Sequence, residues 1–101
     1  MVDTTFIEFL FCLFIVPPKI ITRPSNQTVL ENEEVKLHCA AIGNPIPKIL
    51  WMKDGITIGT GENLMLKTWR NASGTYMCKA KNLLNATAIS NAHVDVQCKY
   101  K

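Results

Sequence analysis

The sequence predicts an all-β fold, a sandwich of two antiparallel sheets with about seven or eight strands. Apolar and polar residues alternate in several short stretches, which is the two-residue period of half-buried strands. Turn-forming residues separate these stretches. Cys39, Trp51 and Cys78, with Tyr76 two residues before the second cysteine, have the spacing that places a disulfide and an indole between two packed sheets.

The length and charge of the chain limit the classes of function. A chain of 101 residues has the size of one domain with one core. The net charge is +3, and the 11 Lys and Arg residues are scattered, which argues against a nucleic-acid groove or a patch for anionic lipids. We expect no nucleic-acid partner, no small-molecule substrate and no cofactor, and contact with a membrane only through a parent chain.

The folded domain is expected at residues 17–97. Residues 98–101 are expected to begin a linker or tail. Residues 1–16 are expected to lie outside the domain, and two interpretations of them stay open. They are either a signal peptide or an incomplete N-terminus.

The apolar run Phe9–Val16 is the reason for these two interpretations. It is far shorter than the ~20 residues that a membrane helix needs. A short apolar run near the N-terminus resembles the middle of a secretory signal. However, Asp3 and Glu8 are acidic, and no small-residue cleavage site precedes Pro17.

The first strands are predicted from an interrupted pattern. Lys19–Arg23 is extended and partly apolar, Pro24-Ser25-Asn26 interrupts it, and the strand resumes at Thr28–Leu30. Such a kink lets one edge strand begin on one sheet and finish on the other. The next strand is predicted to place four residues inward: Val35, Leu37, Cys39 and Ala41.

The tryptophan strand follows a loop that is rich in proline. Ile49 and Trp51 share the parity that faces the core. Asp54-Gly55 predicts a tight hairpin, after which a short strand at Ile56–Ile58 folds back beside the tryptophan strand.

The remaining strands again follow the two-residue period. Leu64 and Leu66 indicate one strand, and Trp69 begins the crossing to the next. The last two strands are predicted to face the core with six residues: Tyr76, Cys78, Ala80, Ala92, Val94 and Val96. No helix of two turns is indicated in the domain.

Four cysteines permit three pairings, and sequence alone does not choose among them. Their positions favour Cys39 with Cys78, because both fall in the middle of predicted strands with Trp51 between them. Cys12 lies in the apolar leader and Cys98 at the end of the last strand, so we expect them to be too far apart to pair. A structural disulfide also indicates a compartment outside the reducing cytosol.

Three motifs extend through the domain: Gly43-x-Pro45-x-Pro47-x-Ile49-x-Trp51-x-Lys53-Asp54-Gly55, Leu64-x-Leu66, and Gly74-x-Tyr76-x-Cys78-x-Ala80-x-Asn82. Together they resemble the intermediate (I-set) immunoglobulin domains over nearly all of residues 18–97. The resemblance implies an immunoglobulin-like Greek-key β-sandwich that binds proteins and is not an enzyme. Such domains occur in adhesion molecules, receptor kinases and phosphatases, matrix proteins and muscle proteins.

One position departs from the family pattern. Two residues before the glycine of the tyrosine corner, where the family usually has an aspartate, this chain has Ala72. The corner is therefore expected to lack an ion pair, while Tyr76 still hydrogen-bonds the backbone. A partly exposed ion pair contributes only about 0 to 1 kcal/mol, so the expected loss of stability is modest.

Three N-glycosylation acceptors fall on predicted surface turns. They are Asn26-Gln27-Thr28, Asn71-Ala72-Ser73 and Asn85-Ala86-Thr87. Chance acceptors are common, but none of these lies in the centre of a strand. We expect at least two to carry glycans in a secretory host.

Metal binding and catalysis have no support in the sequence. A zinc site would need His38 and His93 to converge with cysteines, but these histidines are predicted to point outward from different sheets. Glu33-Glu34 is a pair in a turn, and Asp54 is a hairpin residue. No nucleophile stands beside a base, so no enzyme activity is expected.

The two outer faces of the sandwich are predicted to differ. Strand parity places Leu50, Met52 and Met77 outward on the sheet that also carries Lys79, Lys81, His93 and Asp95. The opposite sheet shows Lys36, His38, Met65 and Lys67. Apolar residues surrounded by charge on an exposed sheet are typical of a protein-binding surface. The alternative is that the strand after the hairpin, or a neighbouring domain, covers them.

We therefore interpret the chain as an extracellular, non-catalytic binding module, typical of cell adhesion. The predicted partner face comprises Leu50, Met52, Met77, Lys79 and His93. Its expected partners are other immunoglobulin-superfamily or cell-surface proteins, in homophilic or heterophilic contact. Two alternatives stay open: a ligand-binding unit of a signalling receptor, and a structural spacer in a matrix or muscle filament.

Overall fold

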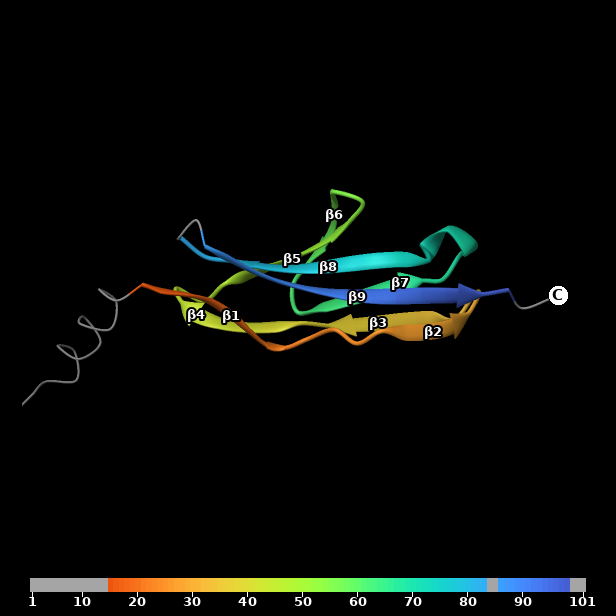
Figure 1. Ribbon diagram of the computed structural model, residues 1–101, viewed down its shortest axis with the longest axis horizontal. Helices are drawn as coiled ribbons and strands as arrows, with labels where there is room; N and C mark the ends of the chain where they lie inside the picture. Colours follow the sequence, from red (N-terminus) through yellow and green to blue (C-terminus); the bar gives the residue numbers. More distant parts are fainter. Residues whose placement is uncertain (1–14, 84–85, 99–101) are drawn as a thin grey trace, which may run out of the picture.

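The computed structural model describes residues 15–83 and 86–98, which form two layers of strands (Figure 1). One layer is a five-stranded sheet in the order β2-β9-β8-β5-β6, and the other consists of two strand pairs, β3-β7 and β1-β4. The strands are β1 (Val16–Thr22), β2 (Gln27–Leu30), β3 (Glu34–His38), β4 (Ala40–Asn44), β5 (Lys48–Lys53), β6 (Ile56–Thr60), β7 (Asn63–Lys67), β8 (Gly74–Lys81) and β9 (Thr87–Gln97).

The first edge strand changes layers as its interruption predicts. β1 pairs with β4 in one layer, and β2 pairs with β9 in the other. The break lies at the buried Pro24, which has no backbone N–H to donate to a ladder. The chain keeps its direction across this break, so β2 runs parallel to β9, and the five-stranded sheet is mixed rather than wholly antiparallel.

The strand predicted around the first cysteine is divided in two. β3 pairs with β7, and β4 pairs with β1, so the chain changes partners at Cys39. Across the break the Cys39 backbone N–H donates to the Glu62 carbonyl over 2.8 Å, and the buried amide therefore remains satisfied.

The hairpin and the last strands agree with the sequence predictions. β5 turns through Asp54-Gly55 into β6, with Lys53 opposite Ile56, and Asp54 and Gly55 both have positive φ angles. η1 (Arg70–Ala72) is a single 3₁₀ turn between β7 and β8. The described chain enters the sandwich at the end where β1 and β4 lie and leaves it at the opposite end (Figure 1).

The core lies between the two layers and is centred on a disulfide and an indole. Cys39 and Cys78 are joined, as predicted, with their Cα atoms 6.5 Å apart. Trp51 is 0% exposed, and its indole N–H donates to the Gly61 carbonyl over 2.8 Å. The other buried members of this cluster are Val35, Leu37, Ile49, Leu64, Tyr76, Ala80, Ala92 and Val94. Ala41 and Val96, predicted to face inward, pack against the cluster and are only partly buried, as is Leu66.

The tyrosine corner is formed without an acidic residue. The Tyr76 hydroxyl donates to the carbonyl of Ala72, which is itself buried. The ammonium of Lys53 donates to the Asn71 carbonyl over 2.8 Å and lies 5.1 Å from the centre of the Tyr76 ring. A backbone carbonyl and an aromatic face thus surround this cation at the corner.

A buried threonine fixes the turn between β2 and β3, which the sequence did not indicate. Thr68 is 0% exposed, and its hydroxyl lies within hydrogen-bond distance of the carbonyls of Glu33 and Leu30. Its backbone N–H also donates to Glu33. The Asn32 N–H donates in turn to the Thr68 carbonyl, so one residue joins the end of β7 to this turn.

Candidate protein-binding face

The outer side of the five-stranded sheet carries all the residues of the predicted partner face. We call it the β5–β8–β9 face. It comprises Leu50 and Met52 from β5, Met77 and Lys79 from β8, and Ile89, Asn91 and His93 from β9. These residues share one side because their strand parity is opposite to that of Trp51, Cys78 and Ala92, which face the core.

The strand register brings these side chains into rows. Met52 lies directly opposite Met77, and Met77 lies opposite Asn91. In the next row Leu50 lies opposite Lys79, which lies opposite Ile89. Directly opposite side chains on one face of a sheet are in contact range, so the rows form a continuous surface.

The apolar residues of this face are less exposed than the sequence suggested. The side chains of Leu50, Met52 and Met77 are each half-buried, whereas the Ile89 side chain is 51% exposed. β5 and β8 are interior strands of the sheet, so neighbours on both sides cover the stems of these side chains. The face therefore presents partly buried apolar side chains with Lys79 and the exposed His93 beside them.

A shallow hollow lies in this face beside the methionine pair. Its volume is about 250 Å³, and Met52, Met77, Thr75 and Asn91 line it together with the hairpin residues Asp54 and Gly55. The His93 imidazole lies near its edge, with Nδ1 3.4 Å from the Thr75 hydroxyl. Flexible methionines around polar groups allow this hollow to adapt to an inserted side chain.

The outer side of the β3-β7 pair differs in composition. Met65 is 58% exposed, but its outward neighbours are Lys36, His38 and Lys67. His38 Nδ1 is hydrogen-bonded to the Asn63 side-chain oxygen at 2.8 Å, and the Lys67 ammonium lies 5.1 Å from the Trp69 ring. Met65 is thus the one apolar side chain on the outer side of this strand pair, and the exposed Trp69 ring lies beyond the end of β7.

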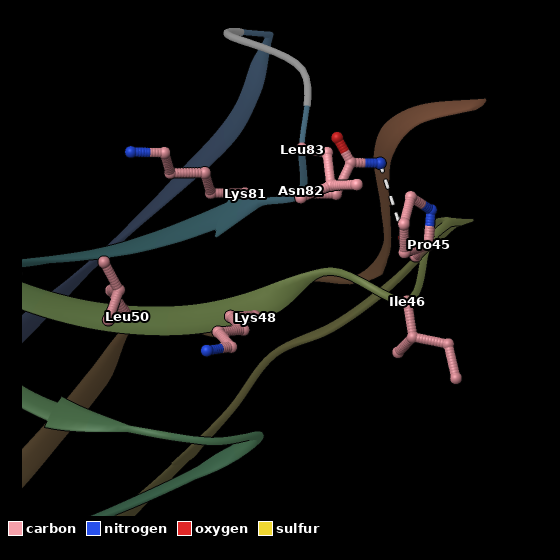
Figure 2. Close-up of a pocket in the computed structure, with 7 residues that line it drawn as sticks. All are labelled: Pro45, Ile46, Lys48, Leu50, Lys81, Asn82 and Leu83. Atoms are coloured by element: carbon pink, nitrogen blue, oxygen red, sulfur yellow. Dashed lines mark hydrogen bonds between the residues drawn. The ribbon is translucent and has the colours of Figure 1, made fainter. Parts of the chain in front are cut away.

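A second hollow, which the sequence did not indicate, lies at the end of the β5–β8–β9 face. It has a volume of about 450 Å³ and forms where the loop before β5 lies beside Asn82 and Leu83, the residues that follow β8 (Figure 2). Seven residues line it: Pro45, Ile46, Lys48, Leu50, Lys81, Asn82 and Leu83. We call this hollow the end pocket. Ile46 is 87% exposed and Leu83 78% exposed, so its walls are the most exposed large apolar side chains described.

Asn82 joins the strands that surround the end pocket. Its side-chain amide donates to the Val16 carbonyl over 2.7 Å. It also donates to the Pro45 carbonyl over 3.4 Å (Figure 2). These bonds connect the end of β8 to the start of β1 and to the loop before β5. Asn82 is therefore tied to the loop before β5. The sequence signal was the presence of Ile46 and Leu83 in predicted turns.

The remaining candidate residues do not converge on a site. His38 and His93 stand on different layers, as predicted. The described residues contain no group of three or more His, Cys, Asp or Glu side chains that could hold a metal ion. Cys98 is exposed and has a free thiol, and Cys12 lies outside the described residues.

Two of the three glycosylation acceptors fall within the described residues. Asn26 is exposed in the loop between β1 and β2, and its Oδ1 accepts from the His93 backbone N–H at 2.8 Å. Asn71 is exposed in η1, while the Ser73 hydroxyl accepts from the Val96 N–H at 2.8 Å. Both asparagines therefore reach solvent, and Asn85 lies outside the described residues.

Two facing layers, an edge strand that changes layers, and a tyrosine corner around a bridged indole define a disulfide-linked sandwich of the immunoglobulin type. The profile described as "Immunoglobulin domain" matches residues 17–82. The chain belongs to the immunoglobulin domain family. Domains of this family and fold are generally binding modules without catalytic activity.

Similar proteins include much longer chains. Neural cell adhesion molecule L1 of Takifugu rubripes is 34% identical over 97 aligned residues, which cover 78% of this chain and 8% of the relative. Hemicentin-1 of Mus musculus is 36% identical over 91 residues, covering 80% of this chain and 2% of the relative. The chain thus spans a small fraction of the length of these proteins.

Solved immunoglobulin structures share the fold. A mutant titin M10–obscurin-like 1 Ig complex has a TM-score of 0.78 at 26% identity, covering 87% of this chain and 100% of the matched chain. Dpr11 IG1 bound to DIP-gamma has a TM-score of 0.75 at 27% identity, covering 82% of this chain and 49% of the matched chain.

No helix in the described ranges is long and apolar enough to cross a bilayer.

Proposed function

We propose that this domain is an extracellular adhesion module that binds another immunoglobulin-type domain through the β5–β8–β9 face. The observation that carries the proposal is that Leu50, Met52 and Met77 occupy two neighbouring rows on the outer side of the five-stranded sheet and are each only partly buried within the described chain. Apolar residues with a charged edge are the usual composition of a binding surface. The face needs no further chemistry, because binding by surface complementarity requires only shape and burial.

The class of partner is proposed from the similar proteins. Both solved structures reported above are complexes in which immunoglobulin domains take part. Either a second copy of this chain or a different immunoglobulin protein would fit the same surface as a binding partner. The face extends over three neighbouring strands, which suits the broad sheet of another domain.

The extracellular location is proposed from the disulfide and from the sugar acceptors. Structural disulfides persist where thiols are not kept reduced. One similar protein is named as a neural cell adhesion molecule. Asn26 and Asn71 are exposed and reach solvent in the fold. Protein exported from an insect or mammalian cell should therefore lose mass on glycosidase treatment, and an unchanged mass would contradict this location.

The likeness to a titin complex keeps a filament spacer as the second candidate. A spacer carries force and has no partner for the β5–β8–β9 face. A signalling receptor that contains this domain would use the same face for its ligand. The binding experiment below separates the spacer from both recognition roles.

The test uses the exported chain as a multimeric bait on an array of secreted immunoglobulin-superfamily ectodomains that includes the chain itself. The wild-type bait should bind at least one member. The Leu50→Lys/Met52→Lys variant should lose that signal, whereas Met65→Lys on the opposite layer should keep it. The proposed face would be overturned if Met65→Lys lost the binding signal while the Leu50→Lys/Met52→Lys variant kept it. It would also be overturned if the Leu50→Lys/Met52→Lys variant bound as well as the wild type. No binding by folded wild-type protein would favour the spacer.

A further inference from the structure

The end pocket has an apolar floor and a cationic edge. Leu50 forms its strand side, and Pro45 and Leu83 lie on its loop side (Figure 2). Lys48 and Lys81 are the charged residues that line it, and both are exposed. No carboxylate is among its seven lining residues.

The two lysines are an unfavourable pair within the sheet. Lys48 lies directly opposite Lys81 in the register of β5 and β8, and Lys79 follows on the same side. Like charges directly opposite on a sheet destabilise the pairing. Within residues 15–83 and 86–98, no carboxylate forms an ion pair with Lys48 or Lys81. Glu62 and Lys48 both line an adjoining hollow.

We propose that the end pocket binds an acidic protein segment in which one large apolar side chain lies between carboxylates. The apolar side chain would enter between Leu50, Ile46 and Leu83, and the carboxylates would lie against Lys48 and Lys81. This inference rests on the proposed function, because it assigns a second contact to the partner of the adjoining β5–β8–β9 face.

Charge and exposure favour this occupant over others. A carboxylate placed between the two lysines would relieve their repulsion, so binding and domain stability would increase together. Ile46 and Leu83 are themselves 87% and 78% exposed, so an occupant must cover them from outside as well as fill the hollow. A protein segment covers such walls, whereas a small molecule is usually enclosed by its site.

The test titrates the full chain with a synthetic peptide and follows its backbone amide NMR signals. The probe is acetyl-Glu-Asp-Phe-Asp-Glu-amide, compared with the same peptide carrying Ser for Phe and with the charge-reversed Lys-Lys-Phe-Lys-Lys. The Phe peptide should shift the amides of Ile46, Leu50 and Leu83 and leave β3 and β7 unchanged. The Ser peptide should bind about tenfold more weakly or worse, because burial of a large apolar side chain is worth at least that factor.

Matched variants separate the pocket from general charge. Lys48→Glu/Lys81→Glu should abolish binding of the acidic peptide, and Leu83→Ser should weaken it about tenfold. Lys36→Glu/Lys67→Glu makes the same change in charge on the opposite layer and should leave it intact. Equal loss in both double variants, tighter binding of the basic peptide, or shifts caused only by a heparin-derived oligosaccharide would overturn the proposal.

The failure of this inference is distinguishable from failure of the proposed function. Leu83→Ser, tested as bait on the ectodomain array, should weaken the signal that Leu50→Lys/Met52→Lys abolishes. If Leu83→Ser binds normally and the acidic peptide shows no shifts, the end pocket is refuted while the β5–β8–β9 face stands. If no ectodomain on the array binds the bait but the peptide binds at the end pocket, the proposed immunoglobulin partner is refuted.

Discussion

The inner and outer sides of the five-stranded sheet are built from the same strands but differ in almost every property. On the inner side, Trp51 and Cys78 are 0% exposed and face the opposite layer. On the outer side, Met52 and Met77 are partly exposed and lie on the side of the sheet away from Trp51 and Cys78. The inner residues are fixed by what the fold must bury, so they determine stability. The outer residues do not have to be buried for the domain to fold, so they are free to form a binding surface.

Removal of the disulfide should produce the largest loss of stability. The bridge links residues separated by 39 positions, for which the chain-entropy model gives about 4 kcal/mol. A Cys39→Ala/Cys78→Ala variant should therefore lose about that free energy of unfolding in urea denaturation. A loss below about 1 kcal/mol would show that the inner side does not depend on the bridge.

Thr68→Val tests a buried polar contact at the edge of the core. The change keeps the shape of the side chain but leaves the carbonyls of Leu30 and Glu33 without its hydroxyl. We expect a loss of about 1–2 kcal/mol in the free energy of unfolding. The exposed Thr57→Val on β6 is the matched control and should change stability by less than about 0.5 kcal/mol. Equal effects in the two variants would contradict this role of Thr68.

Lys53→Met tests the cation at the tyrosine corner. The change removes the hydrogen bond to the Asn71 carbonyl and the contact with the Tyr76 ring, while it keeps most of the stem. The expected loss is about 0.5–1 kcal/mol, measured by thermal or urea unfolding. Lys36→Met, on the outer side of β3, should be close to neutral. A stabilised Lys53→Met protein would show that the corner needs no cation.

The smallest effects on stability are expected on the outer faces. Met77→Lys and Met65→Lys make the same change on opposite layers, at positions that the fold leaves in contact with solvent. Each should alter the free energy of unfolding by less than about 1 kcal/mol in urea denaturation. A cost comparable to that of the disulfide at Met77 would mean that this side chain belongs to the core rather than to a binding surface.

The inner side of the sheet could be predicted from the sequence because burial follows a local period. Alternation of polar and apolar residues assigned Ile49, Trp51, Cys78 and Ala80 to the core, and the same parity assigned Met77 to the outside. The hairpin at Asp54-Gly55 was equally local, since two adjacent residues with positive φ angles determine it.

Features that depend on distant segments could not be predicted in this way. Thr68 is buried because the turn between β2 and β3 folds over it, and nothing in its neighbours indicates that contact. The end pocket requires the loops of Ile46 and Leu83 to meet, which depends on how two strands end. The partial burial of Met52 likewise depends on which strands flank β5 in the sheet.

Methionine methyl NMR tests the proposed binding side most directly. The chain contains four methionines, two of them on the β5–β8–β9 face and Met65 on the opposite layer. Protein labelled with ¹³C at the methionine methyl groups would be titrated with a partner found on the array. The signals of Met52 and Met77 should shift or broaden while that of Met65 stays in place. A shift of Met65 with unchanged Met52 and Met77 signals would contradict it.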